Sequence, residues 1–266
     1  MSADVHSLQR AGMPVEIYPD AEAASRAAAE RIVEVIRAAT AERGKAVLGL
    51  ATGSTPEKVY AHLAARHRAE EFSFRDVVTY NLDEYYPISP VDSKSYRSYM
   101  DRHLFSKTDL LPNRAHLLDG TVPERFVAEH VAEYERWIEA DGGLDIQLLG
   151  IGRNGHIAFN EPSELSLEDA LKLPTRLTQL HPQTIADAAR DFGGVDRVIP
   201  RALTMGISTI LAARSILILA TGPHKAEAVQ QALNGPVTPR LPASLLQTVA
   251  SKVAWLLDAP AAAGLV

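Results

Sequence analysis

The 266-residue sequence contains no cysteine. This excludes disulfides, thiolate nucleophiles and cysteine-based zinc or iron–sulfur sites, and it is compatible with a reducing compartment. Long apolar runs are absent as well: no stretch of about 18 apolar residues occurs, and residues 1–20 lack the apolar core of a signal peptide. We therefore expect a cytoplasmic protein without a membrane partner.

Clustered positive charge is also scarce. The formal net charge is −6, from 27 Lys and Arg against 33 Asp and Glu, and basic runs are no longer than one or two residues. Binding to a phosphate backbone depends on clustered Lys and Arg, so this sequence is not expected to bind nucleic acid. A small anionic substrate remains compatible, because a few cations and backbone N–H groups can hold it locally.

The remaining composition is that of a folded globular protein, with 46% hydrophobic and 23% charged residues and no repeat or interior linker. Short apolar strand patterns alternate with amphipathic helical patterns along the chain. This order predicts an α/β fold: a single domain over residues 14–266 with a mostly parallel, Rossmann-like sheet and helices on both faces. Residues 1–13 carry no pattern, and we expect them to form a flexible leader.

Local signals predict several element boundaries. Asp20 is a good N-cap for a helix over residues 21–40, and Gly44 is expected to end the connection that follows. Residues 200–207 are expected to begin another helix. The polar segment 163–189, with its weak apolar stripe, is predicted to be either a lid or plain surface.

The first strand that ends in a polar turn is the apolar run over residues 45–51, which leads directly into Thr52-Gly53-Ser54-Thr55-Pro56. Gly53 allows the backbone to approach a ligand, and Ser54 and Thr55 offer hydroxyl groups. The turn lacks the Gly-Lys-Ser/Thr ending of a P-loop. Taken alone, it fits a ligand-free helix cap equally well.

A second strand, over residues 77–82, is followed by the adjacent carboxylates Asp83 and Glu84. Successive side chains of a strand face opposite ways, so at most one of the two can point into a given crevice. Taken alone, both could equally belong to a solvated loop.

A third strand, over residues 146–151, ends in the densest group of polar side chains in the chain. Glycines interrupt it, and four polar residues follow within a short span: Asn154, His156, Asn160 and Glu161. A plain core strand does not explain this density. In open α/β sheets such strand ends are where ligands bind.

Four strand ends therefore carry polar turns, at residues 52–56, 83–87, 152–162 and 221–225. The carboxyl ends of parallel strands lie on one edge of a sheet, so these turns are expected to build one pocket. It would hold an anion-binding turn, a carboxylate, a His with a Glu, and a Lys. This set predicts proton transfer on a phosphorylated small molecule, and no metal-binding or nucleotide-binding motif is visible.

The same stretches carry a family resemblance. Over roughly residues 14–260 the chain resembles the glucosamine-6-phosphate deaminase (isomerase) family. The matching sequence motifs are Leu-Gly-Leu-Ala-Thr-Gly-Ser-Thr-Pro, Asn-Leu-Asp-Glu-Tyr, Gly-Ile-Gly-Arg-Asn-Gly-His-Ile-Ala-Phe-Asn-Glu-Pro, Ala-Leu-Thr-Met-Gly-Ile and Thr-Gly-Pro-His-Lys.

The resemblance implies conversion of glucosamine 6-phosphate and water to fructose 6-phosphate and ammonia, without a cofactor or metal. It implies that Asp83 moves a proton between the first two sugar carbons. It also implies that His156 opens the pyranose ring with the help of Asn154 and Glu161. The implied substrate-binding residues are Gly53, Ser54, Thr55, Arg190 and Lys225 for the phosphate, together with Glu84, whose role the resemblance leaves open.

Two departures from the family pattern stand out. Many relatives have Asp at the position of Asn154; an Asn carbonyl can accept an imidazole N–H, but it cannot stabilise imidazolium by charge, so we expect a less basic His156. The second departure lies in segment 163–178, where regulated members bind a phosphorylated effector with basic residues. This chain has acidic residues there instead: Glu164, Glu168 and Asp169. We expect no strong activation by N-acetylglucosamine 6-phosphate, and the choice between monomer and homo-oligomer stays open.

Three other functions compete with this hypothesis. A galactosamine-6-phosphate deaminase would differ only in the stereochemistry that it accepts at C4. A 6-phosphogluconolactonase would share the fold and the phosphate turn. Its usual motif is Gly-His-Thr-Ala-Ser, whereas Ile157-Ala158-Phe159 follows His156 in this chain. A sugar-phosphate sensor would need a DNA-binding segment, for which the predicted leader is too short.

Overall fold

The computed structural model describes residues 5–265, so residues 1–4 of the predicted leader and Val266 lie outside the described part. Within residues 5–265, eleven strands form two sheets. In spatial order, the larger sheet contains β1 (His6–Arg10), β2 (Met13–Tyr18), β11 (Val253–Asp258), β10 (Ser215–Ala220), β7 (Ile146–Leu149), β3 (Ala46–Leu50), β4 (Val77–Asn81) and β6 (Ala115–His116). The smaller sheet contains β5 (Asp83–Tyr85), β9 (Arg201–Thr204) and β8 (Arg176–Gln179).

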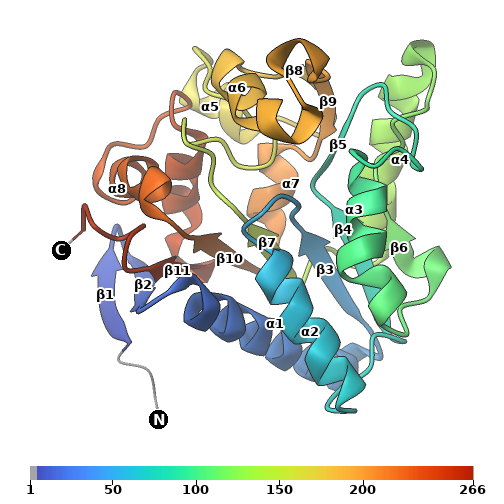
Figure 1. The fold of residues 1–266 in the computed structure, drawn as a ribbon, viewed down its shortest axis with the longest axis horizontal. Coiled ribbons are helices and arrows are strands. Elements are labelled where there is room, and N and C mark those ends of the chain that lie inside the picture. Colours follow the sequence, from blue (N-terminus) through green and yellow to red (C-terminus); the bar gives the residue numbers. More distant parts are fainter. Residues whose placement is uncertain (1–4, 266) are drawn as a thin grey trace.

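Eight α-helices connect these strands along residues 5–265. They are α1 (Ala21–Arg43), α2 (Glu57–Arg68), α3 (Tyr96–His103), α4 (Val127–Ala140), α5 (Leu167–Leu171), α6 (Pro182–Phe192), α7 (Ile207–Ala212) and α8 (Ala226–Asn234). All neighbouring strands of the larger sheet pair in parallel except β1 with β2. Figure 1 shows α1 and α2 in front of this sheet, with α7 drawn fainter behind it. The predicted mostly parallel α/β fold is confirmed.

The central strands are apolar because they are covered on both faces. Every residue of β3, β4 and β7 is buried, as expected for parallel strands between two helical layers. The largest fully buried side chains come from both layers and the sheet and include Trp255, Tyr60, Tyr80, Tyr134 and Phe74. Tyr134 of α4 packs edge-on against Tyr80 of β4, with ring centroids 5.4 Å apart, and this contact anchors α4 to the strand that precedes the site.

The predicted N-terminus of α1 is confirmed, and its C-terminus lies later than predicted. Asp20 accepts a hydrogen bond from the backbone N–H of Ala23 at 2.8 Å, which satisfies one of the free donors at the helix N-terminus. Gly44 ends the helix in the left-handed conformation, with φ of 74°, a conformation that glycine adopts without steric cost. The helix itself continues three residues beyond the predicted range, to Arg43.

Two predictions about elements are wrong. The leader predicted over residues 1–13 contains β1, which pairs antiparallel with β2 and extends the sheet by one edge strand. The helix predicted to begin within residues 200–207 is instead strand β9, and α7 starts only at Ile207. Pairing with β5 and β8 on either side fixes β9 as a strand, so tertiary contacts override the helical propensity of its Ala and Leu residues.

Candidate active site

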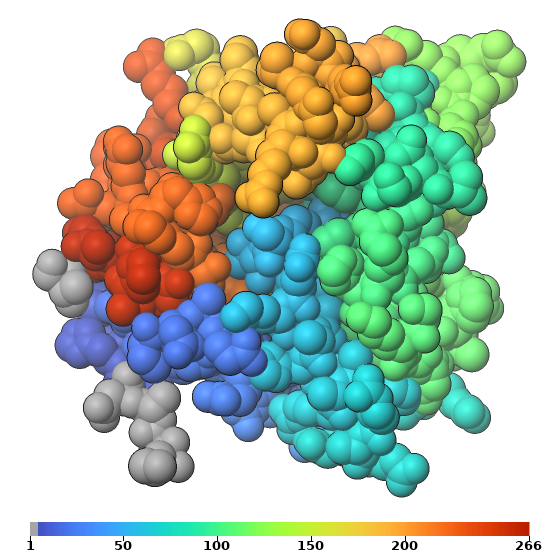
Figure 2. Space-filling model, viewed as in Figure 1, coloured from blue at the N-terminus to red at the C-terminus, as the bar shows by residue number. Residues whose placement is uncertain are grey.

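The four polar strand ends meet at one cavity of about 240 Å³, at the carboxyl edge of the larger sheet. Its wall includes the turn after β3, Asp83, His156 and Lys225. Helix α6 supplies a further wall, which is where the predicted lid segment lies. Figure 2 shows this orange segment directly above the blue turn that follows β3. The predicted convergence of the strand ends is therefore confirmed.

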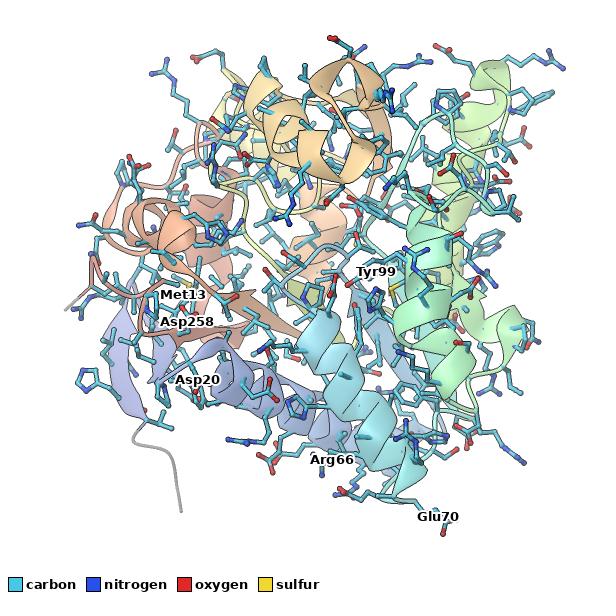
Figure 3. All side chains as sticks on the ribbon, in the orientation of Figure 1. Met13, Asp20, Arg66, Glu70, Tyr99 and Asp258 are labelled. Carbon is cyan, nitrogen blue, oxygen red and sulfur yellow. The ribbon has the colours of Figure 1, made fainter. Side chains whose placement is uncertain are left out.

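The turn after β3 exposes its backbone to the cavity. Gly53 has a φ of 96°, a left-handed conformation that favours glycine. The hydroxyl of Tyr99, on α3, donates a hydrogen bond of 2.7 Å to the carbonyl oxygen of Gly53, and Tyr99 is labelled in Figure 3. Ser54 and Thr55 line the cavity beside Gly53, so the predicted anion-binding turn has its hydroxyls and backbone at the cavity wall.

Asp83 is the buried carboxyl of the cavity, and only 6% of its surface is exposed. Burial, followed by the negative charge of Glu84, raises the pKa of Asp83 to about 8, and a hydrogen bond from Thr52 opposes the shift only in part. A carboxyl with a pKa near neutrality can both accept and return a proton at physiological pH. The alternative in which Asp83 and Glu84 begin a solvated loop is wrong, since both are buried.

Glu84 faces away from this cavity, as the alternation of strand side chains requires. Its carboxylate accepts hydrogen bonds from the Ser95 hydroxyl at 2.7 Å and from the backbone N–H groups of Tyr85, Tyr96 and Arg97. It thereby fixes the N-terminus of α3 to β5. Burial raises the pKa of Glu84, although these hydrogen bonds oppose the shift. Glu84 is not part of the wall of this cavity and lines a separate one, so the structure does not bring it to the predicted substrate site.

His156 is held at one ring nitrogen, Nδ1. This atom lies 3.3 Å from Oε2 of Glu161 and 3.2 Å from the hydroxyl oxygen of Thr184 on α6. The ring also lies flat against Gly152, where a Cβ atom would come within 2.3 Å of the imidazole. Glycine at residue 152 is therefore needed for this position of the ring.

Glu161 faces the imidazole of His156, whereas Asn154 contacts the backbone of His156 and the carboxylate of Glu161. The Asn154 carbonyl accepts from the backbone N–H of His156 at 3.2 Å, and its amide donates to Glu161 at 3.0 Å. Nδ1 of the imidazole thus faces Glu161 and not the Asn154 carbonyl. Burial disfavours the Glu161 carboxylate, but hydrogen bonds from His156, Thr184 and Asn154 outweigh it and lower the pKa of Glu161 to about 2.

The two predicted phosphate-binding cations lie in different places. Lys225 lines the cavity, and the turn before it is fixed by Asp258, whose carboxylate accepts from the backbone N–H of Gly222 at 2.9 Å. Burial lowers the pKa of Lys225, and the charge of Asp187 opposes this shift. Arg190 is exposed on α6 and is not part of the cavity wall.

Several cavity residues were not predicted from the sequence, namely Tyr85, Tyr96, Thr184, Asp187 and Asp191. Tyr85 was predictable, because it lies two residues after Asp83 on the same strand and so faces the same way. The other four lie on α3 and α6. Helix α6 overlaps the segment predicted to be a lid or plain surface, but no local pattern showed which of its side chains would face the site.

Residues 5–265 show neither a metal-binding cluster nor a membrane-spanning helix. No group of three or more His, Asp or Glu side chains is arranged to hold a metal ion in this part of the chain. Within the same residues, no helix has both the length and the apolar character needed to cross a bilayer.

The chain also matches a known protein family. A model of the family described as glucosamine-6-phosphate isomerases/6-phosphogluconolactonase matches residues 19–255. The chain belongs to this family. It is 47% identical over 248 residues to a glucosamine-6-phosphate deaminase of Rhodopirellula baltica, with 93% of this chain and 94% of that protein covered. It is 44% identical over 235 residues to a glucosamine-6-phosphate deaminase of Bacillus velezensis, with 88% and 94% covered.

Solved structures of family members have the same fold. A monomeric glucosamine-6-phosphate deaminase superposes with a TM-score of 0.87 at 41% identity, covering 94% of this chain and 99% of that one. The 6-phosphogluconolactonase of Trypanosoma brucei superposes with a TM-score of 0.77 at 20% identity, covering 98% of this chain and 100% of that one. At that identity the lactonase shares the fold alone.

Proposed function

We propose that this protein is a glucosamine-6-phosphate deaminase, which converts glucosamine 6-phosphate and water to fructose 6-phosphate and ammonia. The observation that carries the proposal is one cavity of about 240 Å³ lined by both a buried carboxyl, Asp83, and the imidazole of His156. The similarity to deaminases at 41–47% identity over most of the chain supports the same function.

The phosphate end of the substrate binds at the turn after β3. The backbone at Gly53 and the hydroxyls of Ser54 and Thr55 donate to the phosphate oxygens, and Lys225, which lines the same cavity, supplies a positive charge. This anchoring places the sugar ring toward Asp83 and His156.

His156 opens the pyranose ring. Glu161 engages Nδ1 of the imidazole, which leaves Nε2 as the nitrogen that meets the sugar. The imidazole takes the proton of the C1 hydroxyl and returns it to the ring oxygen as the C1–O5 bond breaks. The result is an open-chain amino aldehyde.

Asp83 then moves a proton between carbons. Its carboxylate removes the C2 proton, a C1–C2 double bond forms, and the aldehyde oxygen becomes a hydroxyl by taking the proton that the C2 ammonium group gives up. Return of the proton from Asp83 to C1 moves the double bond to C2 and nitrogen. Water adds to this imine, and ammonia leaves with the formation of the C2 ketone.

Incubation with three sugar phosphates tests the proposal: glucosamine 6-phosphate, galactosamine 6-phosphate and 6-phosphogluconolactone. We expect ammonia and fructose 6-phosphate in equal amounts from the first, and no faster loss of the lactone than in buffer. Absence of ammonia from glucosamine 6-phosphate would overturn the proposal. The cytoplasmic location expected from the sequence remains a prediction, and the choice between monomer and homo-oligomer remains open.

A further inference from the structure

A carboxylate of α6 lines the same cavity as Lys225, which the proposed function assigns to the substrate phosphate. Asp187 lines the cavity together with Lys225. Oδ1 of Asp187 lies 3.1 Å from Nη2 of Arg153, a residue of the loop that also carries His156. The same oxygen accepts a hydrogen bond of 2.9 Å from Gln183.

Asp187 is thus the carboxylate that balances two cations. Its ion pair with Arg153 is partly shielded, since 34% of the Asp187 side chain and 47% of the Arg153 side chain are exposed. Lys225 has no carboxylate within 4.0 Å in residues 5–265, and the negative charge of Asp187 opposes the lowering of the Lys225 pKa by burial. A dianionic phosphate beside Lys225 would therefore meet a fixed negative charge.

We propose that Asp187 competes with the substrate phosphate for Arg153 and Lys225 and so weakens phosphate binding in this cavity. Arg153 is not itself part of the cavity wall, and its ion pair with Asp187 holds it beside the cavity. This inference rests on the proposed function for the identity of the ligand, but it needs no catalytic turnover to be tested.

The test uses inorganic phosphate as the probe. Phosphate is titrated into the full-length protein and its Asp187→Asn variant, and the amide NMR signals of Gly53 and Ser54 report binding at the turn after β3. We expect Asp187→Asn to lower the dissociation constant for phosphate about three- to tenfold, because a nearby like charge is removed at a partly exposed site. Glu168→Gln, which removes the same charge from an exposed position on α5, should leave the constant within about twofold of wild type.

A double substitution separates competition from a general charge effect. If Asp187 holds Arg153 away from the phosphate, Arg153→Gln will weaken phosphate binding more in the Asp187→Asn background than in the wild type. An unchanged or weaker affinity in Asp187→Asn would overturn the proposal, as would failure of all variants to bind phosphate. A protein that binds phosphate as expected but releases no ammonia would contradict the proposed function and leave this inference standing.

Discussion

At the residue scale, the decisive feature is the protonation of Asp83. Its pKa of about 8 results first from burial and then from the adjacent Glu84 charge. The carboxyl is therefore mostly neutral at pH 7, and the ionised form that accepts a carbon-bound proton grows as the pH rises toward 8. The proposed deaminase activity should rise with pH over the same interval.

The same pKa predicts a dependence of stability on pH. The folded pKa of about 8 lies above the ordinary value of 3.8, so the folded state holds this proton more tightly than the unfolded state does. Stability is therefore lost as the pH rises from about 4 to about 8. We expect Asp83→Asn, which keeps the shape and removes the charge, to melt at a higher temperature than the wild type at pH 8. The gap in melting temperature should shrink toward pH 5; a gap that does not change with pH would contradict the assigned pKa.

At the scale of elements, Glu84 explains how α3 is fixed beside the site. This residue belongs to β5, yet its carboxylate satisfies the first free N–H groups of α3 and accepts from the N-cap residue Ser95. Tyr96, the first residue of α3, forms part of the cavity wall. Strand and helix are therefore joined by one buried carboxylate behind Asp83.

We expect Glu84→Gln to destabilise the fold by about 2 kcal/mol, because an amide can accept at only one of its two ends and leaves buried donors unpaired. Ser95→Ala, which removes only one of the donors, should cost about 1 kcal/mol. Denaturant unfolding of both variants gives these values. Equal stability of Glu84→Gln and wild type would show that the carboxylate does not fix α3.

Some of the elements could be predicted from the sequence alone, and others could not. Caps and periodicity located α1 to within three residues, and buried apolar runs located β3, β4 and β7, because these signals are local. Strand β9 was mistaken for a helix, since only its pairing with β5 and β8 makes it a strand. The cavity wall formed by α6, including Asp187, was equally hidden, because which helix face borders a cavity depends on distant parts of the chain.

At the scale of the whole molecule, the acidic segment after the His156 loop bears on regulation. Glu164 pairs with Arg240 at 2.5 Å, and Glu168 pairs with Lys172 at 2.5 Å. Both carboxylates are largely exposed. This surface offers little unpaired positive charge for a phosphorylated effector.

We accordingly expect the rate to follow a hyperbolic curve against substrate concentration, with no strong activation by N-acetylglucosamine 6-phosphate. Initial rates measured with and without that compound test this expectation. A sigmoidal curve that becomes hyperbolic on its addition would contradict it.

The proposed function as a whole depends on Asp83 moving a proton at carbon. The most direct test compares ammonia release from glucosamine 6-phosphate by the wild type and by Asp83→Asn, together with substrate binding by both proteins. The account predicts steady ammonia release by the wild type and a loss of about 10³-fold or more in the variant, with binding largely retained, because only the proton acceptor is removed. Ammonia release by Asp83→Asn at a rate near that of the wild type would contradict it.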